Sequence, residues 1–460
     1  MDRRRAVPPR PARFPRRSRL GQRDHRRPGP GADRRVAHGA RPGGRELPRS
    51  TGRAGGHRGV ALRGRPRPDR ARPGAVARGG RRRAGGVALD DPGLRALRRG
   101  RSHRPAVHRA RRGILPNADA AGYYRSALAA DDLARLAART RALSTVERVR
   151  LGHDLEAAFA SAALPGGAVL RALEPLARDP HGAVALVPRK LLALVDAFVV
   201  DGRGSKRRTT LRARIARLYA PAVAALGWAP SAGERPWRRR FRSELYGFLA
   251  LEIEDPAVLA EAARRGRRLL GLDPTGAPRG AGNAVPDAVA PDLADVALGA
   301  AARRGGADVF DALLAELARS DDAQLRQRAL VALAQTRDPA LIGRALDLAL
   351  DPRLRKNERV VALRALLGAP DTRDAAWAWL TAHFDALVPL LPDRFAGQLP
   401  LAVRVCDLHR IDEIRAFFAP RVDRLTGGPR NLAQALEAAT QCAARVAAQR
   451  ESVLAFVDAP

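Results

Sequence analysis

The chain has 460 residues, of which 45% are hydrophobic, enough for a sizeable core in two or three domains. Its formal charge of +37 is concentrated in residues 1–113, which hold 35 Arg and no Lys against seven acidic residues. No apolar run approaches the ~20 residues that span a bilayer, and no apolar secretion-signal segment follows the basic start. The composition therefore argues against a membrane protein and predicts a soluble, cytoplasmic one.

The first predicted segment, residues 1–113, is low in complexity. Arg, Gly and Pro occupy 67 of its 113 positions, so it cannot bury enough apolar surface to offset its chain entropy, and disorder is predicted. Three origins stay open: an out-of-frame translation of a GC-rich gene, a plain disordered tail, or an arm that binds nucleic acid. The absence of Ile, Asn, Tyr and Lys favours the first, and Phe14 as the lone base-stacking candidate disfavours the last.

The sequence changes its character at Ile114. Residues 114–130 contain a Pro116-Asn117 turn and the paired Tyr123 and Tyr124. This pattern predicts a short strand that leaves a small sheet and joins the next domain.

Residues 131–460 are predicted to be all-α. Asp131 and Asp132 supply favourable charge at a helix start, and Ser144 to Glu147 fits a capping box. The apolar spacing predicts helices at 131–139, from 144 through 162, 167–178, 183–200, 207–226, two within 234–270, 308–319, 321–335, 338–350, 355–367, 371–388, 396–406, 410–419 and 429–450. A long loop is predicted at 271–291.

Two aspartates mark a repeat within these helices. Asp338, followed by Pro339, is a helix start, and Asp371 occupies the corresponding position 33 residues later. This spacing equals one helical hairpin, so a HEAT-like helical-repeat solenoid is predicted.

No catalytic motif is found. The nine histidines are residues 25, 38, 57, 103, 108, 153, 181, 383 and 409; none is followed by Glu, and none lies four residues from another. The His-Glu-x-x-His zinc site of thermolysin-like peptidases is therefore excluded. Catalytic and metal-binding residues are predicted to be none, and no cofactor is expected in this chain.

Weaker candidates are interpreted as structural. His153 beside Asp154 is predicted to be a surface pair, His383 a packed side chain, and His409 near Cys406 too incomplete for a metal site. The basic stretch Gly202 to Lys206 has the wrong spacing for a phosphate-binding loop and is predicted to link two helices.

Two further pairs of residues are assigned to the core. Trp377 and Trp379 lie at helical spacing and are predicted to be buried rather than to form a ligand cage. Cys406 and Cys442 are predicted to be two buried, reduced thiols.

Several short stretches carry a family resemblance. They are residues 116–125 (PNADAAGYYR), 143–148 (LSTVER), 226–228 (LGW), 359–364 (RVVALR), 376–380 (AWAWL) with Phe384-Asp385, and 431–437. Their order and spacing resemble the helical carboxy-terminal domain of zinc aminopeptidases of the aminopeptidase N type, also called the endoplasmic-reticulum-aminopeptidase-like carboxy-terminal domain. The resemblance runs from residue 114 to about residue 450.

The resemblance implies a bowl of paired helices that caps a catalytic domain, encloses peptide substrates and supplies arginines to a peptide carboxylate. It also implies that residues 114–130 are the remnant of a β-sandwich and that zinc belongs to the parent enzyme's other domain. Which residues bind substrate is not indicated. The leading hypothesis is the carboxy-terminal portion of a zinc aminopeptidase, separated from its catalytic half and inactive alone, whose partners are peptide or the missing catalytic domain. A free-standing peptide- or protein-binding scaffold, or a nucleic-acid-binding protein using residues 1–113, are the alternatives.

Overall fold

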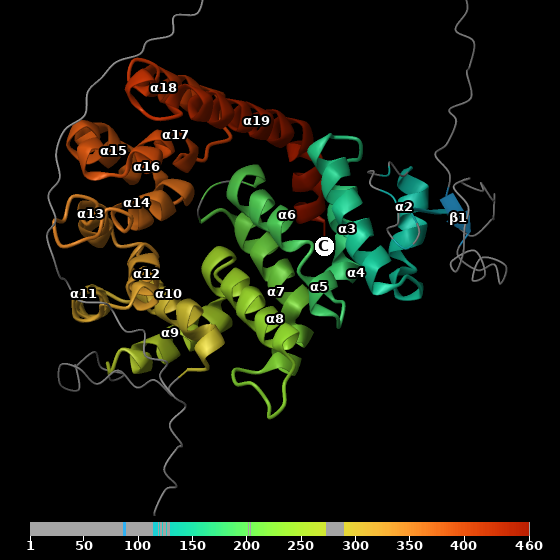
Figure 1. Ribbon diagram of the computed structural model, residues 1–460. Coiled ribbons are helices and arrows are strands. Elements are labelled where there is room, and N and C mark those ends of the chain that lie inside the picture. Colours follow the sequence, from blue (N-terminus) through green and yellow to red (C-terminus); the bar gives the residue numbers. More distant parts are fainter. Residues whose placement is uncertain are drawn as a thin grey trace, which may run out of the picture. The chain divides into compact units, whose positions relative to one another are not determined.

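The computed structural model of the protein describes residues 86–88, 114–117, 119, 122, 126, 129–200, 202, 204–272 and 289–459 (Figure 1). All of them lie in the compact unit Gly80–Pro460. Of residues 1–113, for which disorder is predicted, only the short strand at 86–88 belongs to the described residues.

The described strands are β1 (Gly86–Ala88) and β2 (Ile114–Pro116), which pair antiparallel with Val87 opposite Leu115. Strand β2 lies ahead of the Pro116-Asn117 turn, whereas the strand predicted around Tyr123 and Tyr124 lies outside the described residues. The partner of β2 lies within the segment for which disorder is predicted, so residues 86–88 depart from that expectation.

Asn117 closes the turn after β2. Its side-chain amide donates to the carbonyl of Gly122 at 2.8 Å, and its side-chain oxygen accepts from the Gly122 amide at 2.6 Å. Asn117 adopts a φ of 54°, a left-handed conformation that Asn tolerates better than most residues. The spacing of Asn and Gly in this stretch therefore has a local cause: the two residues bond each other.

The first helices surround an amino-terminal core that includes Phe159, Tyr219, Tyr246 and Phe248. Their bounds are α2 (Ala130–Ala137), α3 (Thr145–Ala160), α4 (Gly166–Ala177), α5 (Gly182–Ala185), α6 (Arg189–Leu194), η3 (Val195–Val199), α7 (Lys206–Leu226), α8 (Pro236–Gly247), η4 (Phe248–Glu252) and α9 (Pro256–Leu269).

Two helix starts in this half follow local sequence signals, and the capping box at Ser144 to Glu147 is predicted from them. Ser144 and Glu147 form the capping box of α3, and Glu147 also accepts a hydrogen bond from the backbone of Asp119, which links the junction to the first long helix. Asp255 caps α9 ahead of Pro256. The single helix predicted at 183–200 is α5 followed, after a break, by α6 and the π-helical turn η3.

The later helices surround a carboxy-terminal core that includes Phe310, Trp377, Phe384 and Phe418. Their bounds are η6 (Pro291–Leu293), α10 (Ala294–Arg304), α11 (Ala307–Arg319), α12 (Ala323–Leu333), α13 (Pro339–Asp347), α14 (Arg359–Gly368), α15 (Arg373–Leu387), η7 (Val388–Leu390), α16 (Asp393–Gly397), α17 (Leu399–Ala402), α18 (Leu408–Phe418), η8 (Val422–Arg424) and α19 (Gly428–Asp458).

Three expectations for this half are wrong. Helix α10 is absent from the sequence prediction. The helix predicted at 396–406 is two short helices, α16 and α17, followed by an extended segment at 403–407. Asp371 is not a helix cap; its carboxylate lies 3.8 Å from both Arg208 and Arg337.

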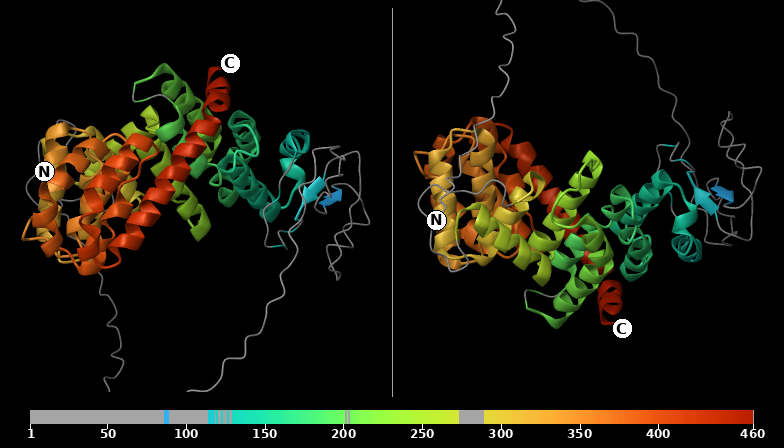
Figure 2. Two further views of the ribbon diagram at one scale, coloured as in Figure 1. Left: turned by 90° about the horizontal axis from the view of Figure 1, so that it is seen from above. Right: turned by 90° about the horizontal axis from the view of Figure 1, so that it is seen from below.

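Helix α19 belongs to both cores. Leu432 and Ala439 pack in the carboxy-terminal core, whereas Val453, Phe456 and Val457 pack in the amino-terminal core. The buried Gln449 donates to the carbonyls of Phe159 and Leu164, at 2.8 and 3.1 Å. Figure 2 shows α19 as one continuous helix that runs to the end of the chain.

The helices that the structure describes include none with a stretch both long and apolar enough for a membrane span.

Candidate functional site

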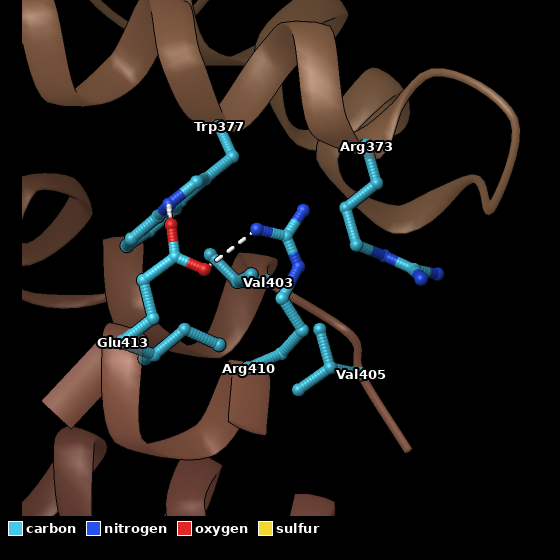
Figure 3. Close-up of a pocket in the computed structure, with 7 residues that line it drawn as sticks. Arg373, Trp377, Val403, Val405, Arg410 and Glu413 are labelled. Carbon is cyan, nitrogen blue, oxygen red and sulfur yellow. Dashed lines mark hydrogen bonds and ion pairs between the residues drawn. The ribbon is translucent and has the colours of Figure 1, made fainter. Parts of the chain in front are cut away.

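A shallow pocket lies where α15 and α18 meet the extended segment 403–407 (Figure 3). It is a surface depression: the roughly 170 Å³ of empty space within it includes open solvent, and it encloses no cavity large enough for a water molecule. It is lined by Arg373, Trp377, Val403, Val405, Arg410, Glu413 and Ile414. The pocket thus combines an apolar floor with two arginines.

The local sequence explains this lining. Arg373 and Trp377 lie four residues apart on α15 and so share one face of that helix. Val403 and Val405 alternate with exposed or half-buried neighbours in the extended segment, which is the period of a strand and turns both valines inward.

Glu413 organises the closed side of the pocket. The indole of Trp377 donates to one Glu413 oxygen at 2.5 Å, and Arg410 donates to the other at 2.6 Å. The second terminal nitrogen of Arg410 donates to Asp374. The charge of Arg410 is therefore neutralised by two carboxylates. In Figure 3, Arg410 lies between Glu413 and the Arg373 side chain.

Arg373 is different. Its Nε and Nη2 are buried and have no hydrogen-bond partner, and its guanidinium lies 5.3 Å from the ring centre of Phe198, a cation–π contact. Burial lowers the pKa of Arg373 to about 10; the charge of Arg410 acts in the same direction, against Asp374 and Asp371. At neutral pH the group is still a cation, so a half-buried positive charge with two unused donors borders the pocket.

Such an arrangement suits an anion. A carboxylate can accept two parallel hydrogen bonds from a guanidinium. Because Nε and Nη2 of Arg373 are covered, side chains around them would have to move for a ligand to satisfy these donors. The valines and Ile414 would contact apolar atoms of the same ligand.

One of the two histidine predictions is confirmed, the packed His383, whereas the predicted surface pair of His153 with Asp154 is wrong. His153 pairs through Nδ1 with Glu156 at 3.1 Å rather than with Asp154, whose carboxylate pairs with Arg150. His383 stacks on Trp379, and its Nδ1 lies 2.9 Å from the carbonyl of Trp379.

His409 and the basic loop both lie at helix starts. His409 is exposed at the start of α18, where its backbone amide donates to Asp407. In the loop that leads to Lys206, Ser205 caps α7 by accepting from the Arg208 amide, and the preceding turn η3 is helical rather than a strand. The helical elements on both sides of the loop agree with the predicted link between two helices.

Trp377 and Trp379 are in the core, as predicted, with 5% and 8% of their surface exposed. Each indole nitrogen still has a carboxylate partner, Glu413 for Trp377 and Asp347 for Trp379 at 2.9 Å. Trp377 therefore has a second role that its spacing did not indicate, since it also lines the pocket.

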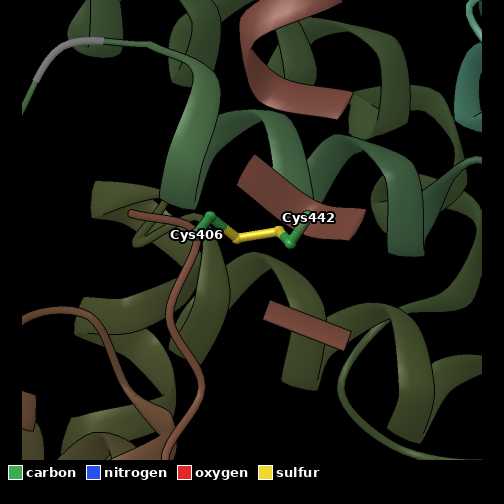
Figure 4. Close-up of a disulfide and its surroundings, with 2 residues drawn as sticks. All are labelled: Cys406 and Cys442. Carbon is green, nitrogen blue, oxygen red and sulfur yellow. A yellow bond between two sulfur atoms is a disulfide. The ribbon is translucent and has the colours of Figure 1, made fainter. Parts of the chain in front are cut away.

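The prediction for the cysteines is wrong. Cys406 and Cys442 form a disulfide, with their Cα atoms 4.9 Å apart (Figure 4). The pairing depends on α19 lying beside the extended segment, a tertiary contact that the separation of 36 residues along the chain does not reveal.

The described residues offer no group of three or more His, Cys, Asp or Glu side chains that could hold a metal ion. The zinc implied by the resemblance therefore does not fit any cluster among them.

The family model described as ERAP1-like C-terminal domain matches residues 113–441. This chain belongs to the ERAP1-like C-terminal domain family. The match starts where β2 begins and covers every helix from α2 to the middle of α19. The pocket of this ERAP1-like C-terminal domain lies wholly inside the match. No curated protein matches the chain significantly.

Proposed function

We propose that the chain is the substrate-enclosing helical domain of a zinc aminopeptidase, and that it binds peptides without cleaving them. The family membership supports the first part. The sequence has no His-Glu-x-x-His, which supports the second. The proposal includes a HEAT-like stacking of helix pairs over 131–460, with residues 114–130 as the junction to a β-domain, and the expected cytoplasmic location.

The observation that carries peptide binding is the Arg373 guanidinium. It is charged and half-buried at the edge of an apolar pocket, and two of its nitrogens, Nε and Nη2, are buried without a hydrogen-bond partner. We assign it to the carboxy-terminal carboxylate of a peptide, with Val403, Val405 and Ile414 against the last side chain. Hydrogen bonds to charged groups contribute about 1.5–3 kcal/mol, so the carboxylate should improve affinity by roughly tenfold to a hundredfold.

The test compares one peptide as its free acid and as its amide, titrated calorimetrically into the full chain. We expect the acid to bind at least tenfold more tightly, and Arg373→Ala to remove that difference. Arg353→Ala is the matched control: it removes the same charge from an exposed arginine that pairs with Asp351. Equal binding of acid and amide, or an unchanged preference in Arg373→Ala, would overturn the assignment.

The free-standing scaffold remains the second candidate because the pocket is complete within the chain. The two functions differ in their partner. If the chain is the aminopeptidase domain, it should bind a metal-bearing domain of its family and change which peptide lengths that domain cleaves. A free-standing scaffold should leave cleavage unchanged.

A further inference from the structure

The Cys406–Cys442 disulfide connects the pocket wall to α19. Cys406 lies in the extended segment 403–407, and Cys442 lies in the first half of α19. Because side chains alternate along an extended segment, Val403 and Val405 face the pocket while Cys406 faces α19. The bridge therefore holds the outer side of the segment whose inner side lines the pocket.

Little else holds this segment. No hydrogen bond between backbone groups involves Val403 to Cys406 among the described residues. The backbone is fixed again at Asp407, whose carboxylate caps α18. A segment with few backbone hydrogen bonds has a low local stability, so the covalent bridge and the burial of two valines keep it in place.

The disulfide also closes a loop that contains α18. This helix carries Arg410, Glu413 and Ile414, three of the residues that line the pocket. The loop thus fixes, relative to α19, both the valine wall and the Glu413 carboxylate that holds Arg410 and Trp377.

We propose that the Cys406–Cys442 disulfide is a redox switch that controls the Arg373 pocket. A dithiol reductant would attack one sulfur as a thiolate, form a mixed disulfide, and leave as its own cyclic disulfide. Two electrons and two protons pass to the protein, and Cys406 and Cys442 become thiols. Segment 403–407 and α18 then loosen, and the pocket loses affinity for carboxylates.

Two features suit the bond to this role. Both cysteines are half-buried rather than enclosed, so a small dithiol can reach them. A cytoplasmic location, which is expected from the sequence, is one where thiol reductants keep most cysteines reduced. The effect on carboxylate binding rests on the proposed function, whereas the loosening of the wall does not.

Hydrogen exchange measured by mass spectrometry on the full chain tests the loosening. The sequence has only these two cysteines, so dithiothreitol has no other target. Amides of residues 404–418 should exchange at least tenfold faster in the reduced protein, while those of α14 should be unchanged. Equal exchange in 404–418 before and after reduction would overturn the switch.

A double variant and a binding measurement separate the two claims. Cys406→Ser with Cys442→Ser should exchange like reduced wild type and ignore dithiothreitol; if it does not fold, reduction and reoxidation of wild type give the same comparison. Peptide acid should bind at least fivefold more weakly to the reduced chain. Faster exchange with unchanged affinity would refute control of binding. If the oxidised chain binds no peptide, the proposed function fails, and the exchange result still decides whether the wall loosens.

Discussion

The guanidinium of Arg373 lies 5.3 Å from the ring centre of Phe198, which joins helix α15 to the π-helical turn η3. Val195 and Val199 of η3 belong to the amino-terminal core, whereas Trp377 of α15 belongs to the carboxy-terminal core. The same arginine borders the pocket and has buried nitrogens without hydrogen-bond partners. Arg373 therefore connects the two halves of the domain at the candidate binding site.

A residue kept for binding should be dispensable for stability. Replacing buried charge by an apolar side chain of similar size is often neutral or stabilising, and the lost cation–π contact is worth about 0.5–1 kcal/mol. We expect Arg373→Met to leave the free energy of unfolding within about 1 kcal/mol of wild type in urea denaturation, while the acid-over-amide preference disappears. A loss of more than about 3 kcal/mol would instead make Arg373 a structural residue.

The buried pair Arg326 and Glu358 should be structural. Two hydrogen bonds of 2.7 Å join them, and both side chains are buried. Removing one partner of a buried pair costs about 3–5 kcal/mol, so Glu358→Gln should lower the free energy of unfolding markedly at pH 7. Glu316→Gln, at a surface pair with Arg319, is the control and should cost below about 1 kcal/mol.

The same pair predicts a pH dependence. The hydrogen bond from Arg326 holds the pKa of Glu358 below its ordinary value. Its contribution is therefore complete above the unfolded pKa of about 4.3 and is lost as pH falls through the lower folded pKa. Denaturation between pH 7 and pH 3 should show wild type and Glu358→Gln converging in acid; a constant difference across that range would argue against the ion pair.

Helix α4 approaches α19 at Gly167. A Cβ on this residue would lie 2.5 Å from the carbonyl oxygen of Ser452 and 3.0 Å from the Cβ of Phe456. Overpacking of this kind costs about 1–3 kcal/mol, so Gly167→Ala should lower the thermal unfolding midpoint. Gly343→Ala in α13, where a Cβ meets nothing within 4 Å, should be neutral or stabilising. Equal effects of the two changes would contradict the described packing.

The disulfide should also stabilise the whole domain. It joins Cys406 and Cys442, which lie 36 residues apart in the sequence. Closing a loop of that length contributes about 3–4 kcal/mol to stability by restricting the unfolded chain. Urea denaturation of wild type with and without dithiothreitol measures this directly. An identical midpoint in both conditions would mean that the bond is absent in solution.

The helices with clear local signals could be predicted from the sequence. Ser144 and Glu147 form the expected capping box, and Asp255 and Asp338 cap the expected helices ahead of prolines. Each signal lies within one turn, so it needs no knowledge of the fold.

The missed elements depend on distant residues. Helix α10 has few polar positions to mark a face, because nearly all of residues 294–302 are buried between its neighbours. The alternation of Val403 and Val405 was a strand-like signal inside a predicted helix. In the sequence, Arg373 looks like an ordinary surface arginine. Its contact with Phe198 depends on the fold, so no local pattern could have revealed the site.

The most direct test of the account is one titration of the full chain with a peptide acid, after which the peptide is analysed by mass spectrometry. We expect saturable binding that depends on Arg373, and a peptide that stays intact. A peptide shortened at its amino terminus, or no saturable binding, would contradict it.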